Sequence, residues 1–281
     1  MTCAYHVVKY WPAKPYKHKN NYMKASSIAD QEQDFAVSKT DADGKLFDLA
    51  PFSVDMPGDP AGTLNAVDCT RHDGDTSYYF TELVEKKRIV VHFTEGFLKG
   101  DLFTLTQTGN HVSVPFLIAR DGTIYNLWAS KNWSYHVGPK AVGGNQTISS
   151  SSVAIELSNI GPLTLKGNEL WGADNAFVYC TLDETDFYTE LPQVYRGYSY
   201  YATFTTAQYT SLITLLRFLT TKYNIPRSFL PEDSRYNLFG SDADAQASTG
   251  IVTHVNFRPS GEKVDIGPAF DWDTVIAGVT A

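Results

Sequence analysis

The chain is poor in cysteine and has no long apolar segment, and both absences limit what it can be. Its three cysteines in 281 residues, Cys3, Cys69 and Cys180, are too few and too widely spaced for a disulfide framework. None of them forms a CxxC pair that would hold a metal. No uninterrupted apolar run approaches the about 18 residues that a membrane-spanning helix requires. We therefore expect free thiols and no insertion into a membrane.

Positive charge is also scarce, and so are apolar residues at the N-terminus. Lysine and arginine number 23 against 31 aspartates and glutamates, which gives a net charge of −8. Because no basic cluster is interleaved with aromatic residues, we expect no nucleic acid partner. Residues 1–19 lack the apolar run of about 7 to 15 residues that a secretory signal peptide needs. The sequence therefore predicts a protein that is cytoplasmic on synthesis.

The first 84 residues differ in texture from the rest of the chain. Short aromatic pieces alternate there with turn-rich stretches such as Asp41–Gly44 and Pro57–Pro60. We expect residues 1–84 to form an N-terminal extension with little regular structure, packed on a core. Residues 85–281 are then expected to form the main domain.

Four segments of that domain have the patterns of β-strands. Residues 88–93 (RIVVHF) form a β-branched apolar run, as expected of a buried strand. Two further runs, 114–119 and 123–128, flank an Asp-Gly pair, which is a strong hairpin signal. Residues 152–159 alternate so that Glu156 lies on the face opposite the larger apolar side chains.

One long helix is predicted over residues 206–223. Its apolar stripe consists of Tyr209, Leu212, Leu216, Leu219 and Tyr223, which recur at steps of three and four residues. Thr205 and Gln208 can form a capping box at its start, and Pro226 stops it. A helix that follows strands without strict interleaving predicts an α/β fold in which a mixed central β-sheet is flanked by α-helices.

Two of the seven histidines lie where chemistry is plausible. His92 lies near the end of the first predicted strand, where a side chain can reach the edge of a sheet. His254 opens a loop rich in Pro and Gly that continues to Asp265. If that loop is extended, Lys263 and Asp265 point to the same side. Two imidazoles and a carboxylate, with one position open, make the pattern of a catalytic zinc site, although spacing alone cannot join ligands so far apart.

Six motifs in order supply that connection. They are IVVHFTEG, VSVPFLIARDGTIYNLW, SYHVG, SVAIELSN, the helix TTAQYTSLITLLRFL and KVDIGPAFDW after His254. Together they resemble the superfamily of zinc amidases and peptidoglycan recognition proteins over about residues 86–276. The resemblance implies cleavage of the amide between N-acetylmuramic acid and L-alanine in peptidoglycan or a muropeptide.

Carried over position by position, the resemblance implies a Zn²⁺ site. His92 and His254 are the expected nitrogen ligands, and Asp265, in the family's K-x-D-x-G-P context, is the expected oxygen ligand. Lys263 matches a family lysine whose charge stabilises the oxyanion that forms as water adds to the amide. Glu156 matches the glutamate of the family's I-E-L strand and is expected to act as general base on the attacking water.

Other residues are expected to contact the substrate. His136 matches the histidine of the family's W-H-x-G motif, with Tyr135 in place of the tryptophan, and implies substrate contact or oxyanion support. Trp171 begins an aromatic stretch that we expect to form one wall of a glycan groove. The alternative is that this stretch packs the extension against the core.

The sequence also departs from the family pattern. The family's S-x-H-Y strand reads Ser113–Phe116 here, so its histidine is missing, and Val114 stands where some phage members have a catalytic tyrosine. Glu156 is therefore the residue expected to act on the attacking water in place of these missing groups. Insertions near residues 161–204 and 227–250 are longer than in the shorter family members, so substrate contacts cannot be transferred through them from the resemblance.

Two function classes compete. A non-catalytic peptidoglycan-binding module typically loses a metal ligand, whereas this chain keeps the whole set, which favours the hydrolase. Among hydrolases we rank a phage-type endolysin or related lytic enzyme first and a cytosolic muropeptide-recycling amidase second, because the extension and insertions exceed the minimal recycling form. We expect a monomer that acts on the cell wall if released or delivered.

Overall fold

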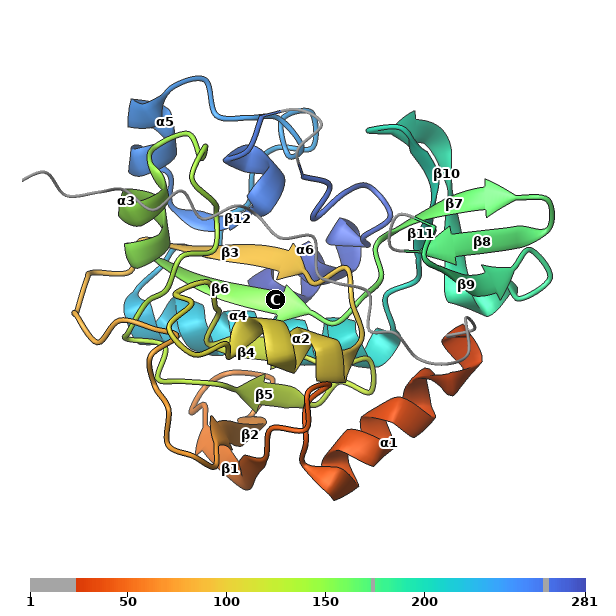
Figure 1. Cartoon of the computed structure of the whole chain (residues 1–281). Helices are drawn as coiled ribbons and strands as arrows, with labels where there is room; N and C mark the ends of the chain where they lie inside the picture. The colour runs from red at the N-terminus through yellow and green to blue at the C-terminus, as the bar shows by residue number, and fades with distance from the viewer. Residues whose placement is uncertain (1–23, 173–174, 260–262) are drawn as a thin grey trace, which may run out of the picture.

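The computed structural model describes residues 24–172, 175–259 and 263–281. It contains a seven-stranded sheet and, beside it, a separate five-stranded sheet (Figure 1). The strands of the larger sheet are, in spatial order, β1 (Phe47–Asp55), β2 (Thr63–Arg71), β5 (Ile124–Asn126), β4 (Phe116–Ile118), β6 (Ser152–Leu157), β3 (Arg88–Phe93) and β12 (Gly250–Thr253).

The larger sheet is mixed, as predicted. β12, β3, β6 and β4 run parallel to one another, β2 runs parallel to β5, and the pairs β1–β2 and β4–β5 are antiparallel. All six residues of β3 are buried, because helices and loops cover both faces of the parallel part, so its apolar run does not alternate with polar residues. The hairpin predicted at the Asp121–Gly122 turn is confirmed as β4–β5.

Helices lie on both faces of this sheet. The helices are α1 (Ile28–Ser38), α2 (Leu98–Leu105), α3 (Asn145–Ser150), α4 (Thr206–Tyr223), α5 (Asp242–Ala247) and α6 (Trp272–Thr280). Figure 1 shows α2 in front of the sheet and α4 behind it. The leucines of α4 pack with α6 against the face that carries Ile89 and Val91, while α2 packs against Leu117 and Ala154 on the other face. None of the described helices is long and apolar enough to cross a membrane.

The predicted bounds of α4 are confirmed. Thr205 and Gln208 form the expected capping box at its start. The helix ends where Asn224 adopts a left-handed conformation, two residues before Pro226, so the proline follows the stop and does not cause it.

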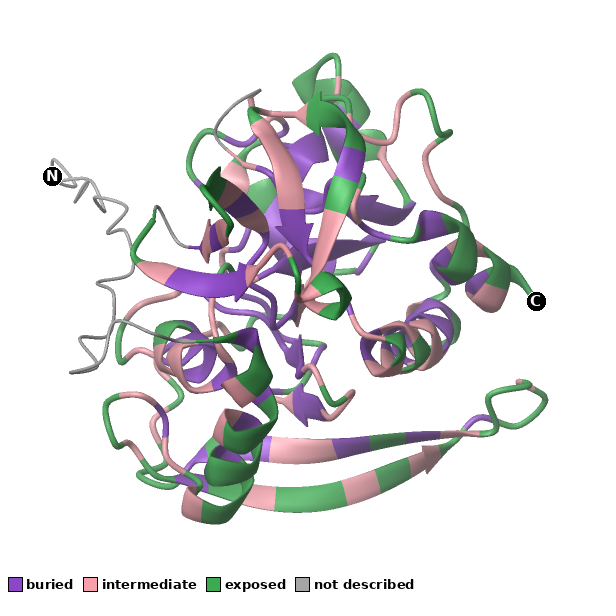
Figure 2. Ribbon diagram, turned by 90° about the vertical axis from the view of Figure 1, so that its right-hand side faces the viewer, coloured by how far each residue is buried: buried purple, intermediate pink, exposed green. Residues whose placement is uncertain are grey.

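The expectation of little regular structure in residues 1–84 is wrong for the part that the structure describes, residues 24–84. That part contains α1 and the strands β1 and β2, and β2 pairs with β5 to extend the central sheet. The hairpin lies at the edge of the sheet, and its outer strand β1 consists mostly of exposed and half-buried residues (Figure 2). Edge strands of this kind have a weak apolar pattern, so turn signals such as Pro57–Pro60 dominated the prediction. Residues 1–23 lie outside the described residues.

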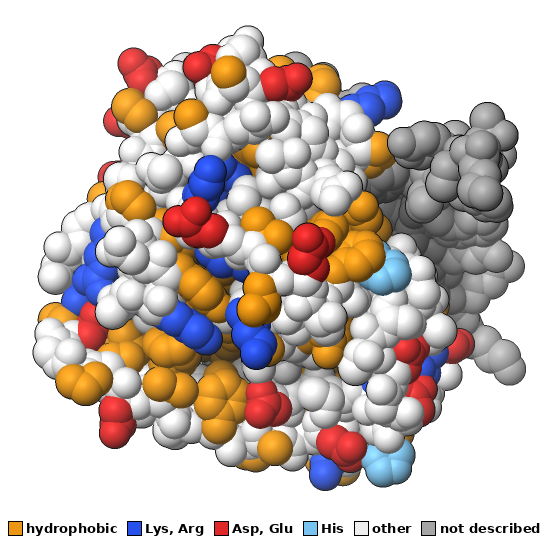
Figure 3. All heavy atoms as spheres, turned by 90° about the vertical axis from the view of Figure 1, so that its left-hand side faces the viewer, with side chains coloured by type: hydrophobic (Ala, Val, Ile, Leu, Met, Phe, Trp, Pro, Cys, Tyr) orange, Lys and Arg blue, Asp and Glu red, His pale blue; other side chains and the backbone are white. Residues whose placement is uncertain are grey.

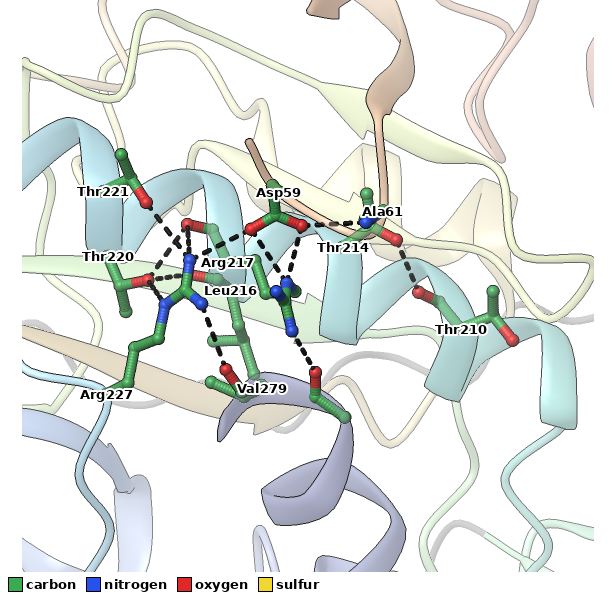
Figure 4. Close-up of polar contacts among 11 residues, drawn as sticks. Asp59, Ala61, Thr210, Thr214, Leu216, Arg217, Thr220, Thr221, Arg227 and Val279 are labelled. Atoms are coloured by element: carbon green, nitrogen blue, oxygen red, sulfur yellow. Dashed lines mark hydrogen bonds and ion pairs between the residues drawn. The ribbon is translucent and has the colours of Figure 1, made fainter. Parts of the chain in front are cut away.

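A buried ion-pair cluster fastens this hairpin to the C-terminal helices (Figure 4). Asp59, in the turn between β1 and β2, accepts hydrogen bonds from Arg217 Nε at 2.7 and 2.9 Å and from Arg227 Nη2 at 3.1 Å. Arg217 also donates to the carbonyl of Gly278 in α6. Burial opposes ionisation of Asp59, but hydrogen bonds from Arg217, the Ala61 amide and Arg227 outweigh it and hold its pKa below the ordinary value.

The insertion predicted near residues 161–204 forms the second sheet, between β6 and α4. Its strands are β7 (Pro162–Lys166), β8 (Glu169–Gly172), β9 (Phe177–Thr181), β10 (Tyr188–Tyr195) and β11 (Tyr198–Ala202). They are antiparallel in the order β10-β11-β7-β8-β9. This sheet lies beyond the carboxyl ends of β3 and β6 (Figure 1). At the opposite end of the molecule, basic side chains lie among acidic and apolar ones (Figure 3).

Replacing Asp59 with alanine should lower the free energy of unfolding by about 3 kcal/mol, because breaking a buried ion pair leaves a buried charge without its partner. We expect the lower end of the usual range, since the Arg227 side chain keeps 31% of its exposure. Urea denaturation of the variant measures the loss. Asp55→Ala, an exposed aspartate of the same hairpin, is the control.

The same variant has a predictable pH dependence. The folded-state pKa of Asp59 is below that of the unfolded chain, so its contribution is fully present above about pH 4 and is lost as the pH falls through the lowered value. The stability difference between wild type and Asp59→Ala should therefore shrink as the pH falls below about 4. A difference that grows on acidification would contradict this account.

Candidate metal centre

The parallel pairing of β3 and β12 brings two histidines to one edge of the sheet. Thr253 is the partner of Val91, so the next residues of the two segments, His254 after β12 and His92 within β3, lie side by side. Asp265 arrives from the loop after β12, and its Oδ2 lies 2.8 Å from His254 Nδ1 and 3.2 Å from His92 Nδ1. One ligand atom from each of the three residues lies within 4.8 Å of the others. The sequence prediction that these three residues come together is therefore matched by the geometry.

A single segment holds the far side of both imidazoles. His92 Nε2 lies 3.1 Å from His136 Nδ1, and His254 Nε2 lies 3.2 Å from the carbonyl oxygen of Val137. The segment is itself fixed, because the amide of His136 donates to Ser149 Oγ at 3.1 Å. Both Nε2 atoms therefore have partners in the protein, and both Nδ1 atoms face Asp265.

The protonation states suit a cation. Burial, reinforced by the neighbouring His254, lowers the pKa of His92 to about 4, so its imidazole is neutral. Burial opposes ionisation of Asp265, but His254 and the hydrogen bonds from both histidines outweigh it and hold the pKa of Asp265 far below the ordinary value. A neutral imidazole and an ionised carboxylate are the forms in which these groups bind metals.

Glu156 lies next to this cluster. In the parallel pairing of β3 and β6 it is the direct partner of His92. Its Oε2 is buried and has no hydrogen-bond partner among the described residues. Burial, followed by the charge of Asp265, raises its pKa well above the ordinary value, while Lys263 opposes that rise. Glu156, Asp265 and Lys263 thus act on one another electrostatically at one edge of the sheet.

The residues predicted to contact substrate are placed differently from one another. His136 is 9% exposed and contacts the ligand His92. Tyr135 packs edge-on against Trp133. Trp171 lies on β8 of the second sheet, where the Lys166 ammonium is 4.5 Å from its ring centroid. Of the three residues predicted to contact substrate, His136 contacts His92 of the candidate cluster. The contacts just described for Tyr135 and Trp171 are with residues outside that cluster.

Two groups that contact the candidate centre could not be predicted from the sequence. The Val137 carbonyl that holds His254 is a backbone group, which no residue pattern can reveal. The second is the turn between β10 and β11, which contacts the loop carrying Lys263. It lies in the insertion whose structure the sequence pattern left unassigned.

The cluster should bind one divalent transition-metal ion per chain. His254→Ala and Asp265→Ala each remove one of three protein ligands, so we expect metal content to fall to near zero in both variants after dialysis against a metal buffer. Elemental analysis of the dialysed protein measures the ratio. His72→Ala, which removes an exposed histidine paired with Asp48, is the control and should keep the wild-type ratio.

Comparison with known proteins identifies the family to which this sequence is similar. The profile of the N-acetylmuramoyl-L-alanine amidase family matches residues 84–268. Among solved structures, the amidase AmiD from E. coli, in complex with anhydro-N-acetylmuramic acid-L-Ala-D-γ-Glu-L-Lys, has 22% identity and a TM-score of 0.44, over 70% of this chain and 59% of AmiD. A structure of AmpD has 22% identity and a TM-score of 0.41, over 73% of this chain and 92% of AmpD.

A third solved structure, AmpDh3 from Pseudomonas aeruginosa, has 16% identity and a TM-score of 0.42, over 70% of this chain and 61% of AmpDh3. A search of curated proteins returned no match. The identification therefore rests on the family profile, which covers more than half of the chain. The chain belongs to the N-acetylmuramoyl-L-alanine amidase family.

Proposed function

We propose that the protein is a zinc-dependent hydrolase that cleaves the amide bond between N-acetylmuramic acid and L-alanine in peptidoglycan. The observation that carries this proposal is the complete set of His92, His254 and Asp265 at the sheet edge where Glu156 also lies. A non-catalytic binding module would need neither a full set of ligands nor two further charged residues beside them.

Zinc suits the residues that would hold it. Two imidazole nitrogens and one carboxylate oxygen leave a fourth position open, which is the arrangement of catalytic zinc sites. When bound, zinc polarises the scissile carbonyl and supplies a nucleophile at neutral pH. The neutral imidazole of His92 and the ionised Asp265 are ready to accept it without a change of protonation.

Glu156 and Lys263 have different roles in the proposed reaction. Glu156 takes a proton from the attacking water and returns it to the leaving amine of L-alanine, a role that suits a carboxylate whose pKa is raised by burial. Lys263 places its ammonium group near the carbonyl oxygen, where negative charge develops as the tetrahedral centre forms. His136 and Val137 keep the ligand imidazoles in one orientation.

Assays on intact cell walls and on soluble fragments distinguish the two biological roles that fit this proposal, a lytic enzyme and a recycling enzyme. The five-stranded insertion enlarges the protein beyond a minimal recycling enzyme, which favours a lytic enzyme of the endolysin type acting on sacculi. We propose that Trp171, on β8 of that sheet, binds the glycan. Incubation with purified sacculi or anhydro-muropeptides, followed by detection of newly free L-alanine amino groups, tests the proposal. No release from either substrate would refute it.

Lys263→Ala and Glu156→Ala should keep zinc but lose turnover. We expect kcat to fall about 10²- to 10³-fold for Lys263→Ala and by a similar or smaller factor for Glu156→Ala, because each group acts on charge that develops in the transition state. Steady-state kinetics with zinc content measured in parallel tests this. Lys87→Ala and Glu85→Ala, which change two exposed residues just before β3, are the matched controls. Near wild-type turnover of zinc-loaded Glu156→Ala would make Glu156 structural.

We also propose that His136 orients His92. Its burial and its contact with His92 Nε2 favour this role over the substrate contact that the family resemblance implies. His136→Leu should weaken zinc binding about 10- to 100-fold, the usual effect of losing a group that orients a metal ligand.

His136→Asn tests the same idea by rescue. The asparagine side-chain amide occupies nearly the position of the histidine Nδ1 and can form a hydrogen bond with His92 Nε2 as donor or as acceptor, so it should restore much of the affinity. Competition with a chromophoric chelator measures the zinc affinity of both variants, and His72→Leu is the control. If His136→Asn binds zinc as weakly as His136→Leu, the hydrogen bond is not what matters.

A further inference from the structure

One turn of the second sheet contacts the loop that carries Lys263 and Asp265. In the β10–β11 hairpin, Tyr195 pairs with Tyr198, and the two residues between them, Arg196 and Gly197, have φ angles of 50° and 91°. Two consecutive residues with positive φ form the tight turn that matches the twist of a β-hairpin. Arginine rarely adopts this conformation, whereas Gly197 adopts it at no cost.

The turn contacts the loop at two points. The guanidinium of Arg196 donates through Nη1 to the backbone carbonyl of Lys263. Two residues after Asp265, the ring of Tyr195 packs on Gly267 so closely that a Cβ there would lie 2.8 Å from Tyr195 Cε1. These contacts hold the loop just before and just after Asp265.

The close approach of Tyr195 to Gly267 does not depend on a left-handed conformation of the glycine. Gly267 does not have a positive φ, so its lack of a side chain serves the close approach of Tyr195 and not the local backbone. The ring of Tyr195 is supported from behind by Tyr236, with ring centroids 5.6 Å apart, and the Arg196 guanidinium lies 5.4 Å from the Tyr195 ring centroid. Gly267 leaves room for the Tyr195 ring, and Tyr236 packs against that ring. The contact between the turn and the loop is therefore specific.

We propose that Arg196 and Tyr195 are positioning residues of the metal centre, through which the inserted sheet fixes the direction of Lys263 and the place of Asp265. This inference rests on the function proposed above for those two residues. A hydrogen bond from a charged donor to the Lys263 carbonyl fixes the backbone from which the ammonium projects. Displacement of a catalytic group by about 1 Å can cost about 10²-fold in rate, so such anchoring has a measurable effect.

The inserted sheet is thereby given a function beyond contact with substrate. Its β10–β11 end lies beside the segment that follows β12, on the side of the molecule where the metal ligands emerge (Figure 1). The sheet would set the geometry of catalysis as well as line the site.

The test compares Arg196→Ala, Arg196→Lys and Lys87→Ala in the full-length protein. Lysine can still donate one hydrogen bond to the Lys263 carbonyl, so it should rescue the alanine variant at least in part. Lys87→Ala removes an exposed cation that directly precedes β3, and it is the control. Two quantities are measured: zinc affinity by chelator competition, and kcat and KM on muropeptide with zinc saturating.

We expect Arg196→Ala to weaken zinc binding about 10-fold and to lower kcat about 10- to 100-fold with little change in KM. The melting temperature should stay near that of Lys87→Ala. Wild-type zinc affinity and kcat in Arg196→Ala would overturn the proposal, as would a loss that Arg196→Lys does not relieve.

The outcomes separate this inference from the proposed function. If the wild-type chain binds zinc but releases no L-alanine amino groups, the proposed function fails, and the zinc affinities of the Arg196 variants still decide whether the turn positions Asp265. A wild-type chain that binds no zinc would overturn both. Tyr195→Ala, which removes the ring from Gly267, provides a second variant and should reproduce the zinc phenotype of Arg196→Ala.

Discussion

The parallel pairing of β3 with β6 on one side and β12 on the other is the constraint on which the site depends. It makes Glu156 the direct partner of His92, and it puts His254, the residue after the last residue of β12, beside His92. Backbone hydrogen bonds in a fully buried ladder fix these relations, and a shift of one residue would turn the side chains to the other face. The loop that carries Asp265 then has only to close over two histidines that the sheet has already placed.

The same buried environment acts oppositely on the two carboxyl groups of the site. Asp265 accepts hydrogen bonds from both histidines, so it is ionised despite burial. Glu156 has a buried oxygen without a partner among the described residues, and burial together with Asp265 raises its pKa. One carboxylate is thus suited to hold a cation and the other to exchange protons, a division that follows from hydrogen bonding and not from residue type.

Much of this arrangement could be predicted from the sequence, for identifiable reasons. β3 and α4 have strong periodic patterns, and α4 has a capping box at its start, so their bounds were predicted closely. The ligand set could be assigned only because a family resemblance joined distant motifs. The half-exposed strands β1 and β2 and the second sheet, rich in tyrosine and poor in aliphatic residues, lack such patterns. The contacts of Val137 and Arg196 with the site depend on backbone carbonyls, which leave no trace in residue type.

The cluster around Asp59 has a consequence for the order in which the chain acquires its structure. Asp59 and Arg217 are 158 positions apart, and Arg227 is 168 positions from Asp59. During synthesis from the N-terminus, the β1–β2 ribbon is made long before α4 and α6 exist, and β5, which pairs with β2, also comes later. Closing a loop of this length is slow, because the chain loses conformational entropy before the contacts that stabilise the closed loop have formed. Until the residues between Asp59 and Arg217 have been made, the ribbon lacks its charged partners, so its attachment is a late step of folding.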